Sequence, residues 1–224
     1  MKKLSTLLFF AILGLNNINA ATFSSVASGT WSAPATWTMT SGTDSDGIPD
    51  LNDDVTINAG HTVILAILQN YFKTLTIAAS GALNVNSKAL NGYGNLTNNG
   101  TISGTFYYYR VYAPTIITSS TPLTNSGEWY FYANTTIAAG TVINKPTTNY
   151  IQPRNNAVVT NLGNVTSKIY ISNTASWVNG PNSFLTLPAA IGGTLNVNFS
   201  AIGNTVQYIQ VTVHPATYYN LTLT

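Results

Sequence analysis

One phrase of this sequence occurs twice in almost the same form, as GALNVN at residues 81–86 and as GTLNVN at residues 193–198. A second phrase, in which Thr-Ile is followed within a few residues by Gly, begins at Thr56, Thr76 and Thr136. Its copies start 20 and then 60 residues apart. Such self-similarity indicates that one structural unit is stacked repeatedly along the chain.

A third phrase, built from Leu, Thr, Asn or Ser and Gly, begins at Leu96 and returns 27 residues later at Leu123. Short alternating segments with a Gly-bearing turn every twenty-odd residues are typical of a β-solenoid. We therefore predict an all-β fold in which a solenoid encloses one continuous core.

The repeated phrases also predict which side chains are buried. Successive side chains of a strand point to opposite faces, so the aliphatic and Asn positions of each phrase separate. The aliphatic set should point inward: Leu83, Val85, Leu195 and Val197. The amide set should face outward or stack in ladders: Asn84, Asn86, Asn196 and Asn198. Helical periodicity is limited to residues 66–73, for which we expect a short helix or a loop.

The first twenty residues read as a secretory signal peptide. Lys2 and Lys3 form a basic start, residues 4–15 are mostly apolar, and Ala20 ends a small-residue cleavage site. The apolar run is shorter than the ~20 residues that a membrane-spanning helix needs. We expect a secreted or cell-surface protein with no transmembrane segment after signal removal. Because Cys is absent, it must be stable without disulfides.

Charge gives little reason to expect a nucleic-acid partner. Only 6% of the residues are charged, and the formal net charge of +2 includes Lys2 and Lys3, so the mature chain is close to neutral. The remaining basic residues are scattered, with no cluster that would follow a phosphate backbone. With 45% apolar residues in regular alternation, the chain has enough material for a buried core.

The mature chain divides into two parts by sequence pattern. Residues 21–54 contain Trp31, Trp37 and an acidic loop, without a long apolar alternation, and we expect them to form an N-terminal cap. Residues 55–224 carry the alternating strand pattern of the solenoid. This pattern continues through residues 218–224 without a capping Pro, Gly or charge. Either the last turn has an open edge or the sequence is a fragment of a longer protein.

Several of these phrases resemble a known group of proteins. The segments GTWS at 29–32 and ATW at 35–37, followed by NDDVTI at 52–57 and GHTV at 60–63, resemble the start of secreted β-helical surface repeat proteins of Bacteroidetes. The same segment is similar to the G8 domain, an extracellular β-rich module. The ending at 215–223 looks like a recurring unit of the same repeat proteins. The resemblance implies a right-handed parallel β-helix, export and attachment to the cell surface.

The acidic loop is the one segment with metal-like chemistry. Five carboxylates lie within eleven residues: Asp44, Asp46, Asp50, Asp53 and Asp54. The Asp-x-Asp-Gly order places oxygen ligands around a tight turn, as hard cations require, and the phrase resembles extracellular calcium-binding repeats. The sequence therefore predicts calcium as the one candidate cofactor. The alternative is a solvated acidic turn that begins the first strand.

Aromatic residues form a second candidate site. Rings flanked by amides and Arg can stack on sugar faces, which predicts a glycan groove lined by Tyr107, Tyr109, Tyr112, Trp129, Tyr130 and Tyr132. The alternative is that these rings fill the interior or cover a sheet face, as aromatic residues do in many strands. We favour this structural alternative.

No residue pattern predicts catalysis. His61 and His214 have no carboxylate or nucleophile at a motif spacing. A glycosidase needs paired acids, and Glu128 is the only acid beyond the loop. A lyase that uses a basic residue stays an alternative, with four candidates that spacing does not separate: Arg110, Lys145, Arg154 and Lys168.

We expect an exported, non-enzymatic structural or adhesive protein of the cell surface, whose partners are surface glycans or other surface proteins. The alternative is a carbohydrate-binding or carbohydrate-processing module.

Overall fold

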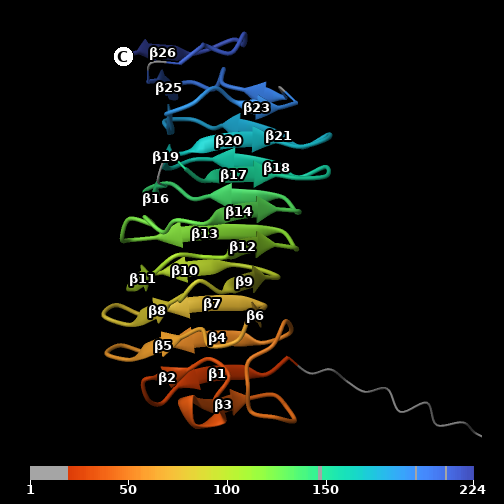
Figure 1. Cartoon of the computed structure of the whole chain (residues 1–224), viewed down its shortest axis with the longest axis vertical. Coiled ribbons are helices and arrows are strands. Elements are labelled where there is room, and N and C mark those ends of the chain that lie inside the picture. The colour runs from red at the N-terminus through yellow and green to blue at the C-terminus, as the bar shows by residue number, and fades with distance from the viewer. Residues whose placement is uncertain (1–19, 146–147, 195, 210) are drawn as a thin grey trace, which may run out of the picture.

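The computed structural model describes residues 20–145, 148–194, 196–209 and 211–224. In these ranges the chain forms short β-strands and a single turn of 3-10 helix, η1 (Pro34–Thr36). The strands of successive turns lie above one another in an elongated stack (Figure 1). The predicted all-β solenoid is therefore confirmed, while its right-handed sense stays a prediction.

Three sides enclose the stack. The first side is a ten-stranded sheet made of β24 (Val197–Asn198), β21 (Ser176–Asn179), β18 (Val158–Asn161), β15 (Thr135–Ile137), β13 (Thr115–Ser119), β10 (Leu96–Asn98), β7 (Thr74–Ile77), β4 (Asp54–Ile57), β1 (Thr22–Ser25) and β3 (Trp37–Ser41). The second is a seven-stranded sheet made of β23 (Gly192–Gly193), β20 (Lys168–Ile171), β17 (Tyr150–Pro153), β14 (Glu128–Phe131), β12 (Tyr108–Val111), β9 (Ala89–Gly92) and β6 (Gln69–Phe72).

Two smaller sheets supply the third strand of most turns. The N-terminal turns contribute β11 (Thr101–Ser103), β8 (Ala82–Asn84), β5 (Thr62–Ile64) and β2 (Gly29–Thr30). The C-terminal turns contribute β16 (Val142–Asn144), β19 (Asn164–Thr166), β22 (Phe184–Leu187), β25 (Thr205–Tyr208) and β26 (Asn220–Leu223).

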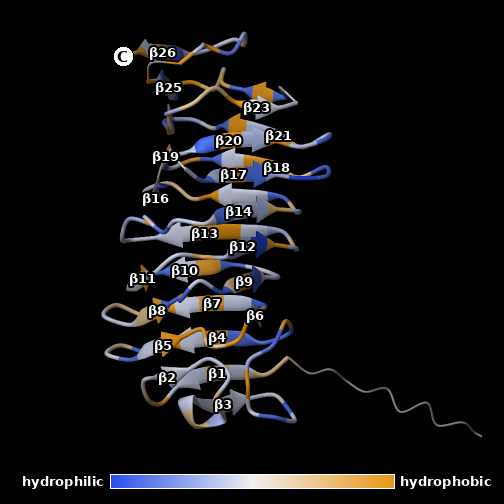
Figure 2. Ribbon diagram, viewed as in Figure 1, coloured by the Kyte–Doolittle hydropathy of each residue, from blue (hydrophilic) through white to orange (hydrophobic). Residues whose placement is uncertain are grey.

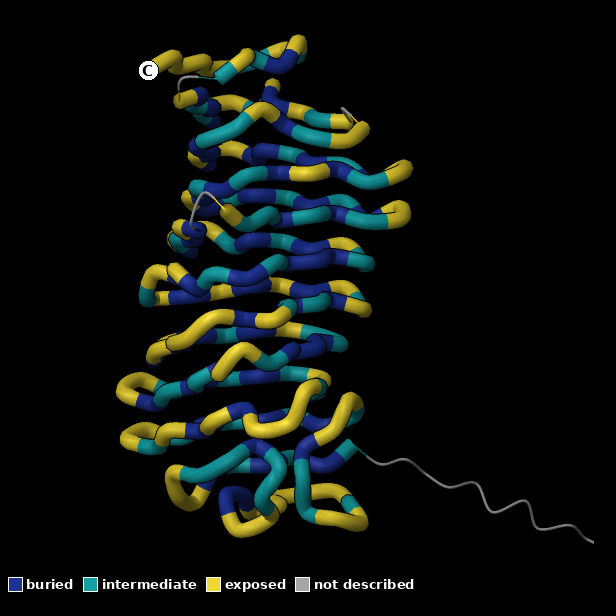
Figure 3. The backbone as a smooth tube through the Cα atoms, viewed as in Figure 1, coloured by how far each residue is buried: buried dark blue, intermediate teal, exposed yellow. Residues whose placement is uncertain are grey.

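The core is a set of side-chain columns that run along the stack. Parallel pairing places equivalent inward residues of successive turns in register, and one column of the ten-stranded sheet consists of Phe23, Val55, Leu75, Leu96, Ile117 and Ile137. All six are buried. Apolar residues recur along the stacked strands in Figure 2, and buried residues alternate with less buried ones in Figure 3. Each turn thus extends the core of the turn before it.

The predicted alternation holds where the structure describes it. Leu83 and Val85 are fully buried, and Val197 is partly buried against the core. Leu195 lies outside the described residues. In the amide set, Asn84 is half-buried, whereas the other three members are exposed: Asn86, Asn196 and Asn198. The separation follows from the two-residue period of a strand.

The Thr-Ile phrase recurs because each copy ends in the same turn. Gly60, Ser80 and Gly140 stand at the equivalent position of the three copies and have φ of 77°, 62° and 80°. This left-handed conformation is the one that Gly adopts without steric cost, and Ser80 is the exception among the three. The repeats therefore encode a corner of the solenoid as well as a strand.

The N-terminal segment joins the stack directly. β1 and β2 pair in parallel with β4 and β5, so strands of the solenoid's sheets begin before residue 55. β3 pairs antiparallel with β1, and it is the sole antiparallel pairing among the described strands. The expected helix or loop at residues 66–73 is wrong for its second half, because β6 occupies Gln69–Phe72 and pairs with β9.

Candidate functional site

The outward side of the seven-stranded sheet, here called the tyrosine face, gathers aromatic and charged side chains. Strand alternation and register place these residues on it: Tyr71, Tyr108, Arg110, Glu128, Tyr130, Tyr150, Gln152, Lys168 and Tyr170. Inward residues of the same strands belong to the core. Parallel stacking brings together tyrosines from strands that are far apart in the sequence.

Two residues predicted to bind glycans lie inside the solenoid. Tyr109 and Trp129 are 0% and 1% exposed, because they alternate with the outward Tyr108 and Tyr130. Their rings meet edge to face with centroids 5.3 Å apart. Neither residue can contact a ligand on the tyrosine face, so the glycan prediction is wrong for both, and the favoured alternative of an interior position is confirmed for them. Burial raises the pKa of the Tyr109 hydroxyl.

Lys145 lies beside this aromatic core. Its Nζ is 4.6 Å from the centroid of the Trp129 ring and donates to the backbone oxygens of Asn125 and Gly127, at 3.3 and 2.6 Å. Burial lowers the pKa of the ammonium to about 7, and the Glu128 carboxylate opposes that change. Lys145 is only 2% exposed, so its contacts are with the protein interior and not with a ligand at the surface.

The tyrosine column, which consists of Tyr93, Tyr112, Tyr132 and Arg154, lies at one edge of the tyrosine face. Tyr112 and Tyr132 stack with centroids 5.1 Å apart and an interplanar angle of 3°, and Tyr93 stacks on Tyr112 at 5.3 Å. The Arg154 Nη1 donates to the Tyr132 hydroxyl at 3.2 Å. Because Tyr93 and Tyr132 stack on the two faces of the Tyr112 ring, this ring has no free face for a sugar.

Two adjoining hollows give the tyrosine face its concave surface. The first hollow, of about 610 Å³, is lined by Thr105, Phe106, Tyr107, Tyr108, Ser126, Gly127, Glu128, Tyr130, Thr148 and Asn149. The second hollow, of about 300 Å³, is lined by Glu128, Tyr130, Tyr150, Gln152, Arg154 and Tyr170. They share Glu128 and Tyr130. In the second hollow the rings of Tyr150 and Tyr170 are nearly perpendicular, at 82° with centroids 6.1 Å apart.

Cations are concentrated on this face. The Arg110 guanidinium lies 4.5 Å from the Tyr108 ring, that of Arg154 lies 3.9 Å from the Tyr130 ring, and Lys168 Nζ lies 5.7 Å from Tyr150. Among the described strand residues that point outward on the tyrosine face, Glu128 is the one carboxylate, and it accepts a hydrogen bond from the Tyr130 hydroxyl. Burial and Glu128 raise the pKa of Tyr130, so this hydroxyl remains a donor at neutral pH.

The acidic loop uses its carboxylates locally. Asp44, Asp46 and Asp50 each accept hydrogen bonds from backbone N–H groups two or three residues later. Asp53 accepts two further backbone N–H bonds, and Asp54 lies 3.7 Å from Lys73 Nζ. Within the described ranges, no three His, Cys, Asp or Glu side chains are grouped as metal ligands. Calcium binding by the loop stays a prediction.

The histidines have structural contacts. His61 Nδ1 lies 2.9 Å from Ser25 Oγ, and the Asn58 N–H donates a hydrogen bond to the same Oγ. Ser25 is fully buried, so this pair links the first two turns. The backbone oxygen of His214 accepts a hydrogen bond from the Tyr218 hydroxyl.

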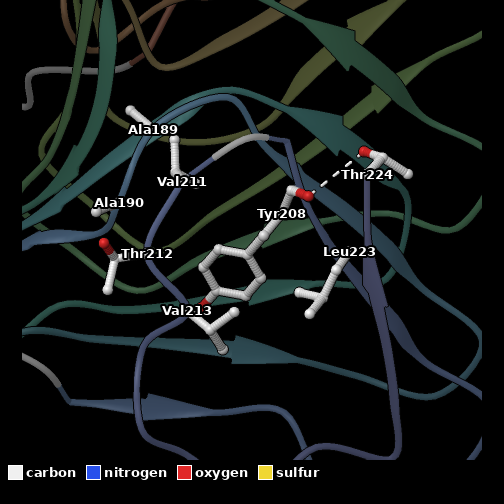
Figure 4. Close-up of a pocket in the computed structure, with 8 residues that line it drawn as sticks. All are labelled: Ala189, Ala190, Tyr208, Val211, Thr212, Val213, Leu223 and Thr224. Atoms are coloured by element: carbon white, nitrogen blue, oxygen red, sulfur yellow. Dashed lines mark hydrogen bonds between the residues drawn. The ribbon is translucent and has the colours of Figure 1, made fainter.

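A larger pocket of about 810 Å³ lies in the last turns, between β25, β26 and residues 211–213 (Figure 4). Tyr208, Val211, Val213 and Leu223 supply its apolar lining. The Thr224 hydroxyl donates to the Tyr208 backbone oxygen at 3.4 Å. No charged residue lines this pocket.

Sequence reasoning missed part of the tyrosine face. Tyr150, Gln152 and Tyr170 occur singly between unremarkable residues, whereas the predicted residues stand in conspicuous aromatic runs. A signal was present, because Tyr130, Tyr150 and Tyr170 follow at intervals of 20 residues, the first interval of the Thr-Ile phrase. Aligning the aromatic residues at this 20-residue spacing would have predicted that the three tyrosines lie on neighbouring turns of the solenoid.

Comparisons with protein-family models, with curated proteins and with solved structures find no match to this chain. Among the described residues, no helix is long and apolar enough to cross a membrane.

Proposed function

We propose that this chain is an exported, non-enzymatic adhesive protein of the cell surface that binds glycans through the two hollows of the tyrosine face. The observation that carries the proposal is the second hollow. There Tyr150 and Tyr170 present rings in different orientations, while Gln152, Arg154 and Glu128 supply hydrogen-bonding groups around them. Apolar ring surface combined with a few polar groups is the usual chemistry of a small-ligand site.

Charge favours acidic sugars as the ligand class. Arg110, Arg154 and Lys168 accompany a single outward carboxylate, Glu128, on the sheet strands of the tyrosine face. Guanidinium groups bind carboxylates with two parallel hydrogen bonds. Arg154 lines the second hollow, whereas Arg110 and Lys168 lie outside both hollows on the same face. Glycans that contain uronic or sialic acids and extend from the second hollow over this face therefore fit it better than neutral glycans do.

A glycan array probed with the mature chain tests this proposal, followed by calorimetry on any sugar that binds. Tyr150→Ala and Arg154→Ala should each weaken binding about tenfold or more, as truncation of a central contact does. Tyr71→Ala is the matched control, because Tyr71 lies on the same face but lines neither hollow. An array without binding, or binding that the two hollow variants leave unchanged, would contradict the proposal.

A purely structural role is the second candidate. It is favoured by the tyrosine column, whose rings are engaged with one another, and by the small number of charges on the chain. This role predicts a silent array and a stable fold.

A further inference from the structure

The start of β1 is held by a buried carboxylate. The Ala21 N–H donates to Asp53 Oδ1 at 2.8 Å, and the Asp54 N–H donates to the Ala21 oxygen at 2.9 Å. The Asp53 side chain therefore takes the position of the next acceptor in the parallel ladder between β1 and β4. Ala21 is fully buried, and Asp53 is 3% exposed.

Asp53 has no cationic partner among the described residues. Its second oxygen accepts the Asp50 N–H at 2.7 Å, and the one ion pair in the described ranges joins the neighbouring Asp54 to Lys73. Burial raises the pKa of Asp53, as do the carboxylates of Asp50 and Asp44, while the backbone hydrogen bonds lower it. A buried carboxylate is costly unless a positive charge or several hydrogen bonds compensate it.

The chain itself can supply a cation that pairs with Asp53. The expected signal peptide ends at Ala20, so the bond that a signal-peptidase type of endoprotease would cleave is the Ala20–Ala21 peptide bond, whose nitrogen contacts Asp53. Hydrolysis consumes one water molecule, leaves a carboxylate on Ala20 and an amine on Ala21, and this amine takes up a proton. Cleavage has to come before the first turn folds, because Ala21 is fully buried in the folded chain.

We propose that processing after Ala20 creates an α-ammonium group on Ala21 that forms an ion pair with the buried Asp53 and fixes the first turn of the solenoid. The ammonium keeps the existing contact to Asp53 Oδ1 and gains a charge there. This inference rests on the export part of the proposed function and is independent of glycan binding.

The close packing at this point makes the position of the amine specific. Gly42 lies against the chain here, and a Cβ on it would be 2.4 Å from the Ala20 oxygen and 2.7 Å from the Ala21 Cα. Removal of Ala20 takes away this carbonyl oxygen, whereas the Ala21 Cα keeps its close approach to Gly42. A chain that begins one residue earlier places its amine away from Asp53 and keeps a neutral amide at the contact.

The mass of the exported protein and the stability of defined N-termini test the proposal. The mature mass should correspond to a chain that begins at Ala21. A chain made to begin at Ala21 should melt about 3 °C or more above one that begins at Ala20, which corresponds to a coupling of about 1 kcal/mol in a chain of this size. Asp53→Asn should remove that difference, whereas Asp46→Asn, whose side chain accepts the Ile48 N–H instead, should keep it.

A second measurement does not depend on folding of the Asp53 variant. The pKa of the Ala21 amine, followed by NMR in the unmodified mature chain, should lie at least one unit above the ordinary value of about 8. A mature mass that begins at another residue, an ordinary amine pKa, or a melting difference that survives in Asp53→Asn would each overturn the proposal. None of these outcomes affects the glycan array, so the two proposals fail separately.

Discussion

At the scale of single residues, burial of Lys145 makes the charged form of its side chain less stable than in water. Its ammonium is surrounded by Trp129 and two backbone oxygens, and burial lowers its pKa to about 7. In the unfolded chain the pKa is about 10.4. Between these values the unfolded state binds more protons than the folded state, so the free energy of unfolding rises with pH. Below pH 7 both states are protonated, and the penalty is constant.

We therefore expect the melting temperature to rise between pH 7 and pH 9, and Lys145→Met to remove most of this rise. The slope contributed by this one residue cannot exceed about 1.4 kcal/mol per pH unit. Thermal melts at several pH values measure it, with Lys168→Met as the control for an outward lysine. If the slopes of the parent chain and Lys145→Met are equal, Lys145 keeps its ordinary pKa in the folded chain.

Single residues also show how far the sequence could predict the structure. Leu83 and Val85 were predictable because Asn separates them, so that only one of the two alternating sets can be buried. In residues 106–112 both sets are largely aromatic, and local sequence does not say which set faces inward. Tyr109 was therefore a candidate for the glycan groove as well as for the interior, although its alternation with Tyr108 follows from any strand.

At the scale of elements, the tyrosine column couples neighbouring turns outside the core. Tyr112 stacks on Tyr93 in the turn before it and on Tyr132 in the turn after it. Aromatic pairs contribute about 0.5–1.5 kcal/mol each beyond the area that they bury. The central ring thus takes part in two such pairs, and the column adds side-chain stacking to the backbone hydrogen bonds between the turns.

Tyr112→Ala should lower the free energy of unfolding by about 1–3 kcal/mol, since it removes two stacked pairs. Urea titration measures the loss. Tyr219→Ala is the control, because Tyr219 is 51% exposed and has no ring partner among the described residues. Equal effects of the two substitutions would show that the stacking in the column does not stabilise the chain.

Elements without repetition were the hardest to predict. Residues 66–73 lack the Thr, Asn and Gly phrases of the other strands, yet β6 forms there because β9 supplies a neighbouring parallel strand. In the acidic loop, spacing indicated a cation site, whereas the described carboxylates engage backbone N–H groups. Spacing alone does not distinguish these two uses of an aspartate, since both need oxygen atoms at a tight turn.

At the scale of the whole molecule, the two ends of the stack differ. At the N-terminal end of the ten-stranded sheet the antiparallel β3 interrupts the parallel order. At the other end of the stack β26 continues the parallel order of its own sheet and, among the described strands, pairs with β25 alone. All four residues of β26 are exposed, and Leu221 and Leu223 are 42% and 62% exposed. An unprotected parallel strand with apolar side chains is a template for another strand.

A chain made to begin at Ala21 should therefore associate through β26. Light scattering over a range of concentrations should show a mass that rises above that of the monomer, because the free backbone groups of β26 and its two leucines become paired and buried in the complex. The double substitution Leu221→Lys and Leu223→Lys should suppress this association, since charged side chains on an edge strand oppose the approach of a second strand. Ile67→Lys with Leu68→Lys is the matched control, because those residues are similarly apolar and exposed but lie just before β6, far from β26. A monomer at every concentration, or association that the control reduces as much as the β26 variant does, would show that this edge does not recruit a partner strand.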